Sequence, residues 1–62
     1  MSDDFNMSMR KFLKQVGVTS QQEIEAAMRA KGETGKSYGL KMTLVCEELG
    51  LHHEVSGEIA GD

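Results

Sequence analysis

Two different spacings of hydrophobic residues run along the chain, and each predicts its own kind of element. In the first part the apolar positions fall at steps of three and four, the spacing of one helix face; they are Phe5, Met9, Phe12, Leu13 and Val16. This spacing predicts a helix over about residues 4–16, and Gly17 is expected to end it in the left-handed conformation. Ser20 and Glu23 then fit a capping box, which predicts a second helix over about 20–31.

Beyond the second helix the helical spacing disappears and an alternation of apolar and polar residues replaces it. Residues 32–39 contain three glycines and no apolar period, so we predict a glycine-rich loop there. The alternation then predicts strands over about 40–47 and 51–59. The expected fold is a single small α+β domain over residues 1–62, with two N-terminal helices packed on a C-terminal antiparallel β-hairpin, in the order ααββ.

The length of the hairpin loop decides which residues lie opposite each other. A loop with an even number of residues keeps the apolar faces of the two strands matched. A two-residue turn at Leu49-Gly50 sets Leu44 opposite Val55, and this register is the preferred one. A four-residue turn over 47–50 preserves the same faces with other partners.

Charge and cysteine content restrict the classes of protein that fit. The net charge is −3, but all seven Lys and Arg precede residue 47, where they outnumber five acids, while five unopposed acids follow. An acidic chain is a poor candidate for nucleic-acid binding, which depends on neutralising phosphates. Cys46 is the single cysteine, so no disulfide forms within the chain and a cytoplasmic protein is expected. No export signal or membrane segment is apparent.

The segment Ala30–Ser37, Ala-Lys-Gly-Glu-Thr-Gly-Lys-Ser, fits a permissive form of the phosphate-binding loop that includes Lys36. That chemistry requires a loop that leaves a strand and enters a helix, so that N–H groups and the helix dipole converge on phosphate. Here a helix precedes the segment and a strand follows it. A glycine-rich loop without a nucleotide is therefore the favoured interpretation.

One cluster holds residue types that bind metals: Cys46, His52, His53 and Glu54. In the preferred register Cys46 and His53 face each other across the hairpin. Structural zinc requires four ligands and catalytic zinc three, and a thiol–imidazole pair for catalysis requires an orienting group and a pocket. We therefore predict no catalytic, cofactor-binding or metal-binding residue, and no cofactor.

Two further features indicate partners. The run from Phe12 to Ile24 is similar to the turn and second helix of a helix-turn-helix, with Gln21 and Gln22 placed to read bases, although Glu23 and Glu25 would oppose phosphates. Met7 lies off the apolar stripe of the first helix and is therefore the methionine that indicates a binding partner.

The run from Phe5 to Glu25, Phe-Asn-Met-Ser-Met-Arg-Lys-Phe-Leu-Lys-Gln-Val-Gly-Val-Thr-Ser-Gln-Gln-Glu-Ile-Glu, resembles the N-terminal signature of a family of short, uncharacterised proteobacterial proteins. The segments Lys41-Met42-Thr43-Leu44 and Gly57-Glu58-Ile59 are similar to that family's strands. The resemblance implies a bacterial cytoplasmic protein of unknown function and carries no catalytic or binding residue with it.

The sequence thus favours a small non-enzymatic interaction or regulatory protein, with an unidentified protein partner. A homodimer is expected to form through an edge of the sheet, because a two-stranded sheet leaves both edges open and Lys41 is the one charged residue within the first strand. The alternative is a weak helix-turn-helix DNA-binding protein.

Overall fold

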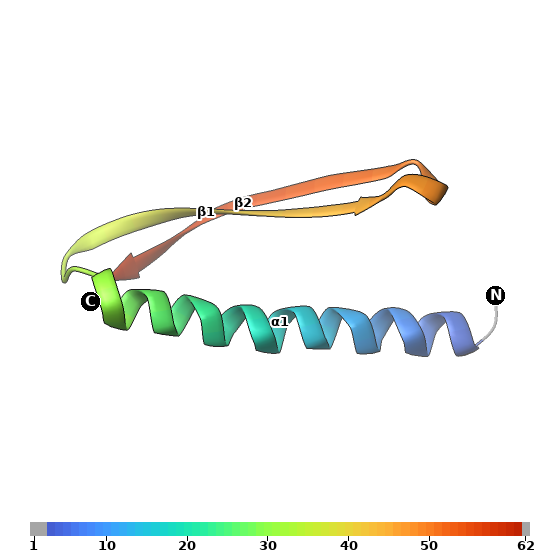
Figure 1. Ribbon diagram of the computed structural model, residues 1–62, viewed down its shortest axis with the longest axis horizontal. Helices are drawn as coiled ribbons and strands as arrows, with labels where there is room; N and C mark the ends of the chain where they lie inside the picture. The colour runs from blue at the N-terminus through green and yellow to red at the C-terminus, as the bar shows by residue number, and fades with distance from the viewer. Residues whose placement is uncertain (1–2, 62) are drawn as a thin grey trace. The chain divides into compact units, whose positions relative to one another are not determined.

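The structure is a computed structural model that describes residues 3–61. It contains one α-helix, α1 (Asp3–Lys31), followed by two antiparallel strands (Figure 1). The 29 residues of α1 begin with two acids, Asp3 and Asp4, and end with Arg29 and Lys31 in the last turn. This order of charges suits the helix dipole, which is positive at the N-terminus and negative at the C-terminus.

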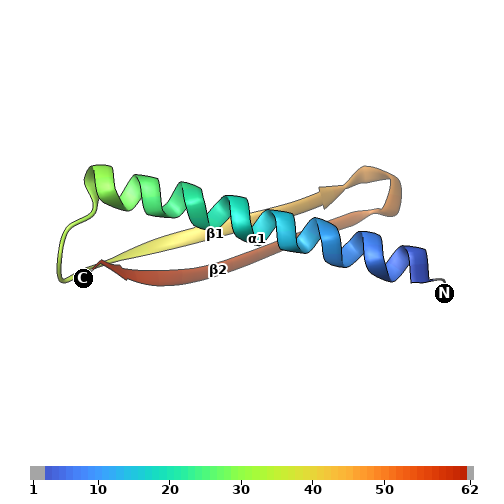
Figure 2. The ribbon, with the colours of Figure 1, turned by 90° about the horizontal axis from the view of Figure 1, so that it is seen from below.

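The prediction of two helices separated at Gly17 is wrong, because α1 passes through this residue without a break (Figures 1 and 2). A glycine inside a helix costs about 1 kcal/mol relative to alanine, but it does not by itself end the helix. Nor do the polar residues after it cap a new helix. The hydroxyl of Thr19 donates a hydrogen bond of 2.8 Å to the carbonyl of Gln15, one turn earlier in the same helix.

Because α1 is continuous, the apolar faces predicted for two helices lie along one stripe. Four residues at steps of four, which form a single row along the helix, are half-buried: Val16, Ser20, Ile24 and Met28. The more exposed residues Met9 and Leu13 continue the stripe toward the N-terminus. We call this surface, together with Phe5, the α1 stripe.

The hairpin consists of β1 (Lys36–Cys46), a 3₁₀ turn η1 (Glu47–Leu49) and β2 (Leu51–Gly61). Both strands were predicted, but β1 begins four residues earlier and β2 ends two residues later than expected. The predicted glycine-rich loop over 32–39 is therefore too long: its last four residues belong to β1 and pair with residues 58–61 of β2. The glycines do not prevent this pairing, since β2 supplies a partner at each position.

The turn between the strands has four residues, because Cys46 pairs with Leu51. The preferred two-residue turn was wrong, and the four-residue alternative is confirmed. The physical reason lies in the turn itself: two-residue hairpin turns require glycine-like backbone angles at their first position, where Leu49 would stand. The longer turn needs a left-handed residue only at Gly50, whose φ is 63° and whose N–H donates to the carbonyl of Glu47 at 3.1 Å.

The hairpin has one apolar and one polar face, as the alternation predicted. The paired positions Met42–Val55 and Leu44–His53 lie on the apolar face, and Lys41–Ser56 and Thr43–Glu54 lie on the other. The apolar face comprises Tyr38, Leu40, Met42, Leu44, Cys46, Leu51, His53, Val55 and Ile59.

The expected hydrophobic core is absent from the described residues. No hydrophobic side chain between positions 3 and 61 is buried, and twelve large ones are exposed. The chain divides into two compact units, residues 1–31 and 32–62, and each has one amphipathic surface of its own. The packing of the helical part on the hairpin stays a prediction.

Candidate functional site

The structure separates the four residues of the predicted metal-ligand cluster. Cys46 lies opposite Leu51 and His53 opposite Leu44, so the expected pairing of Cys46 with His53 is wrong, although the two residues share the apolar face. His52 lies on the polar face, where its Nε2 atom is 3.5 Å from a carboxylate oxygen of Glu54.

Residues on opposite faces of a two-stranded sheet cannot converge on one ion, because successive side chains point in opposite directions. Within residues 3–61 no three His, Cys, Asp or Glu side chains are placed to share a metal. The arrangement offers at most the diagonal pair of Cys46 and His53, and structural zinc requires four ligands.

The segment around Lys36 has the reversed order of elements that the sequence indicated. Helix α1 ends at Lys31 and β1 begins at Lys36, so a turn leads from a helix into a strand. A phosphate loop also needs backbone N–H groups that are free to bind phosphate.

Three N–H groups of this turn already donate to acceptors in the chain. The N–H of Glu33 donates to the hydroxyl of Tyr38 at 2.9 Å. Those of Gly35 and Lys36 donate to the carbonyls of Gly61 and Glu33, at 2.6 and 3.4 Å. The ammonium of Lys36 lies 5.5 Å from the centre of the Tyr38 ring, a cation–π contact. The geometry gives this turn a structural role, anchored by a tyrosine that sequence reasoning did not single out.

The helix-turn-helix pattern loses its turn in the structure, because Gly17 and its neighbours lie inside α1. A recognition helix must be set at an angle to the preceding helix to enter the major groove. Gln21, one of the two predicted base-reading residues, donates its side-chain amide to Glu25 at 3.3 Å on the same helix. Neither observation favours reading of bases by this segment.

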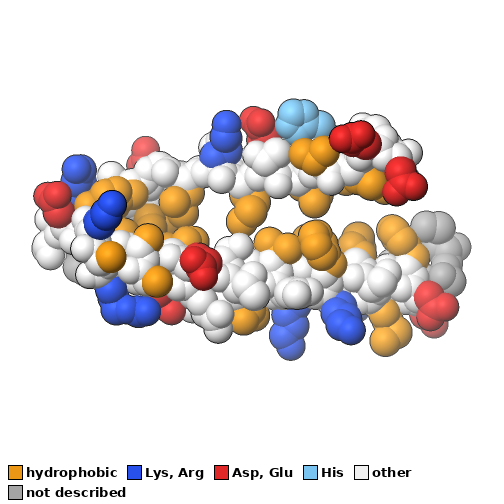
Figure 3. Space-filling model, viewed as in Figure 1, with side chains coloured by type: hydrophobic (Ala, Val, Ile, Leu, Met, Phe, Trp, Pro, Cys, Tyr) orange, Lys and Arg blue, Asp and Glu red, His pale blue; other side chains and the backbone are white. Residues whose placement is uncertain are grey.

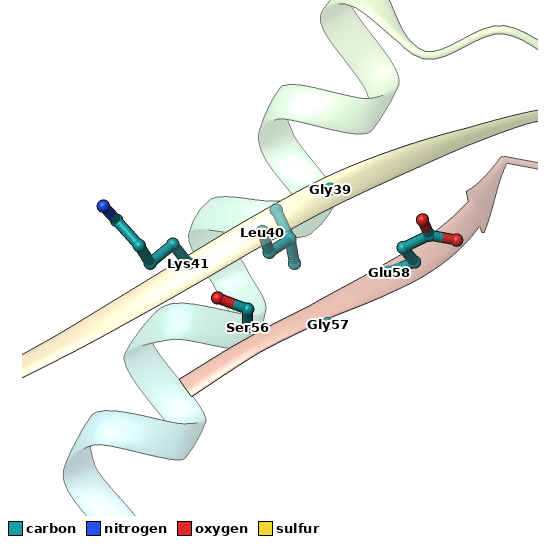
Figure 4. Close-up of a pocket in the computed structure, with 6 residues that line it drawn as sticks. All are labelled: Gly39, Leu40, Lys41, Ser56, Gly57 and Glu58. Carbon is teal, nitrogen blue, oxygen red and sulfur yellow. The ribbon is translucent and has the colours of Figure 1, made fainter. Parts of the chain in front are cut away.

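A shallow, open depression lies on the hairpin around Gly39 and Gly57 (Figure 4). The polar side chains at its margin are those of Lys41, Ser56 and Glu58, and they come from both strands. Figure 4 shows that the ends of the Lys41 and Glu58 side chains point away from each other. On the face that carries these polar side chains Gly39 is the position without a side chain, and the depression does not bring together a catalytic set. The two glycines within alternating strand segments were its only signal in the sequence.

Large hydrophobic side chains are exposed on both units. On α1 the exposed fractions are 50% for Phe12 and 53% for Leu13, and on the hairpin 45% for Met42 and 54% for Val55. Orange hydrophobic side chains are visible at the surface of both units in the space-filling view (Figure 3). Met7, the methionine that the pattern placed off the stripe, is 67% exposed. Such exposed apolar side chains can bind other apolar surfaces.

Within residues 3–61, α1 is not apolar enough over its length to cross a lipid bilayer. The fold and these surfaces define a class: a short α+β chain, with one helix followed by an antiparallel hairpin, that exposes an apolar face on each unit. The chain belongs to a family of unknown function (DUF6494), whose family model matches residues 1–62. No curated protein and no solved structure matches it.

Proposed function

We propose that this chain is a small, non-enzymatic interaction protein, whose apolar surfaces become buried when it binds another polypeptide. One observation carries the proposal: hydrophobic residues make up 39% of the chain, and none of those in the described part is buried. Monomeric proteins rarely leave extended apolar patches in water, and such patches typically mark interaction sites.

The small size of the chain supports the same function. Short chains bury a small fraction of their surface on folding and commonly need a metal, a disulfide or a partner chain for stability. Cys46 has no second cysteine to pair with, and the candidate metal ligands lie on different faces of the hairpin. Binding to a partner chain is a source of stabilisation consistent with both observations. A reducing compartment, the cytoplasm, suits the single free thiol.

Self-association is part of the proposal. In the hairpin each strand pairs on one side only, so an edge of β1 or β2 is available to a second copy. Each strand carries only two charged residues, Lys36 and Lys41 in β1 and Glu54 and Glu58 in β2, so charge gives neither edge strong protection. The sheet edge and the α1 stripe are therefore two surfaces through which copies of the chain can associate.

The proposal is tested with matched variants on the two faces of the hairpin. Met42→Lys and Val55→Lys each place a charge on the apolar face, whereas Thr43→Lys and Ser56→Lys place the same charge on the polar face. Each chain, with a C-terminal tag, is used for sedimentation equilibrium and for quantitative capture of proteins from a bacterial lysate. We expect the apolar-face variants to lose association that the polar-face variants retain.

Equal association of all four variants, or a wild-type chain that neither self-associates nor captures a protein, would contradict the proposal. Duplex DNA is titrated in the same preparations. A salt-dependent shift of the DNA would support the alternative of a DNA-binding protein.

A further inference from the structure

We infer that copies of this chain join head to tail through their hairpins, with the free edge of β1 in one copy pairing with the free edge of β2 in the next. The inference rests on the proposed function and names the contact through which copies associate. Its basis is the difference in charge between the two edges: β1 contains two lysines and no acid, whereas β2 contains two glutamates and no lysine or arginine.

Both edges of the hairpin are long enough to pair with another strand. Each strand has eleven residues, and every residue of β1 is paired with a residue of β2. In an antiparallel pair about half of the backbone N–H and C=O groups point away from the partner strand. The chain contains no proline, which would remove such a donor. In the described part of the chain the sheet has only these two strands, so the outward groups are available to a strand of a second copy.

Three edge contacts keep the apolar faces of two hairpins on the same side of the joined sheet: β1 with β1, β2 with β2, and β1 with β2. All three are antiparallel, because a parallel contact requires one hairpin to be turned over. The first two contacts have a two-fold axis and close as a dimer. The third leaves a free β1 edge and a free β2 edge, to which further copies can bind in the same way.

The two-fold contacts bring together charges of the same sign. On the polar face Lys41 is the charged residue of β1, and Glu54 and Glu58 are the acids of β2. A β1–β1 contact therefore adds no opposite charge to Lys41. A β2–β2 contact offers the glutamates only the imidazole of His52, whose Nε2 atom already lies 3.5 Å from Glu54 of its own strand.

The head-to-tail contact brings together charges of opposite sign. In the register found within the hairpin, Lys41 lies opposite Ser56 of the next copy and diagonal to both glutamates, within reach of a long side chain. A shift of two residues in either direction, which also keeps the faces matched, places Lys41 directly opposite Glu54 or Glu58. Charge complementarity therefore selects the β1–β2 contact, and with it a second copy of the chain as the partner of each edge.

Sedimentation equilibrium of the full-length chain tests the head-to-tail order. Each added copy restores the same two free edges, so the average mass should keep rising with concentration, beyond that of two chains of 6.8 kDa. A two-fold dimer reaches the mass of two chains and rises no further.

Charge reversal at Lys41 tests the choice of edges. Lys41→Glu places an acid next to the glutamates of β2 in every head-to-tail contact, and we expect it to weaken each contact roughly tenfold. Lys36→Glu is the matched control, because Lys36 lies on the other face, opposite Gly61, where β2 has no acid. The triple variant K41E/E54K/E58K restores opposite charges and should associate as the wild type does. In a β1–β1 dimer Lys41→Glu only replaces one pair of like charges by another. NMR spectra of dilute samples verify that each variant keeps its hairpin.

Distances between spin labels test the order of copies independently of charge. In a Cys46→Ser background, labels are attached through Ser37→Cys, Thr43→Cys or Val45→Cys, at exposed positions on the polar face of β1. Head-to-tail copies are related by a shift of two strands, so labels on neighbouring copies should be roughly 10–12 Å apart at all three positions. Dipolar broadening of the electron paramagnetic resonance spectrum, which dilution with unlabelled chains removes, measures this distance. A two-fold axis cannot give one distance at three positions along a strand.

The outcomes distinguish this inference from the function on which it rests. A chain that keeps a mass near 6.8 kDa up to near-millimolar concentration, yet captures a protein from lysate, overturns the inference and supports the interaction function. A mass that stops at two chains, or unequal label distances, overturns the head-to-tail order in favour of a two-fold dimer. A loss of association in Lys41→Glu no greater than that in Lys36→Glu overturns the selection of edges by charge.

Discussion

The helix and the hairpin distribute their charges in different ways. In the hairpin the signs are separated by strand: β1 carries Lys36 and Lys41, and β2 carries Glu54 and Glu58. Lys41 pairs with Ser56, so both glutamates are its diagonal neighbours on the same face. In α1 the signs alternate in blocks along the axis, and Glu25 with Arg29 is the one acid–base pair spaced by four residues. The hairpin therefore separates its charges by strand, with two further acids, Glu47 and Glu48, in η1, whereas α1 separates them along its axis.

The largest expected effect comes from a charge placed in the α1 stripe. If copies associate through the α1 stripe, Met9→Glu should raise the dissociation constant of self-association about a hundredfold or more, since each copy then places a charge on the contact surface. Met7→Glu is the matched control, because Met7 lies about 160° away around the helix and is 67% exposed against 42% for Met9. Sedimentation equilibrium measures both. Equal effects of the two substitutions would show that the stripe is not the contact surface.

The turn of the hairpin should respond strongly to loss of its left-handed glycine. Gly50 has a φ of 63°, and Gly50→Ala should destabilise the hairpin by about 1–2 kcal/mol, because a Cβ is strained in that conformation. Gly57→Ala is the control, since its φ is not positive and a Cβ there meets no atom within 4 Å. Urea unfolding followed by NMR separates the two variants. Equal losses of stability would contradict the strained-turn explanation.

A glycine-to-alanine substitution within the helix should increase stability, whereas at Gly50 it should decrease stability. Gly17 lies inside α1, where a Cβ meets no atom within 4 Å, so Gly17→Ala should stabilise the helix by about 0.5–1 kcal/mol. Thermal melting followed by circular dichroism at 222 nm measures the gain. Ala26→Gly, as a control, should lower stability by a similar amount. A loss of helical signal in Gly17→Ala would indicate that the chain breaks at this position in solution.

The smallest effect is expected for the pair of His52 and Glu54. The two side chains are 66% and 47% exposed, and exposed ion pairs contribute about 0–1 kcal/mol. Glu54→Gln should therefore change the free energy of unfolding by less than about 0.5 kcal/mol at low salt. The change should vanish near 0.5 M salt, because ions screen exposed charges. A larger effect that persists in high salt would assign Glu54 a structural role in the hairpin.

The sequence predicted the faces of the elements better than their boundaries. Alternation placed Met42 and Val55 on one side of the hairpin correctly, because a strand has a strict period of two. Gly17 misled the helix prediction because glycine is compatible with a helix end and with a helix interior, and the local pattern does not separate the two. The identical residue type at Gly50 does adopt the left-handed conformation.

The candidate site was harder to predict, since it consists of surfaces. The absence of catalytic residues was an expectation from the residue types alone, and it remains one. The reversed order of elements around Lys36 was deducible from the sequence, whereas the hydroxyl of Tyr38 as acceptor for the N–H of Glu33 was not. This hydrogen bond depends on the residue at which β1 begins. The glycines in that part of the sequence led to a later start of the strand being predicted.

The adjacent glycines of the hairpin also affect the order in which its ladder forms and opens. Gly39 pairs with Glu58 and Leu40 with Gly57, so at this level each face of the sheet lacks a side chain. Water reaches the backbone amides there more easily than amides covered by side chains. We expect the hydrogen bonds between these glycines and η1 to form first, because they join residues that are closest in sequence. The segment from Lys36 to the glycines then closes last and exchanges its amide hydrogens first.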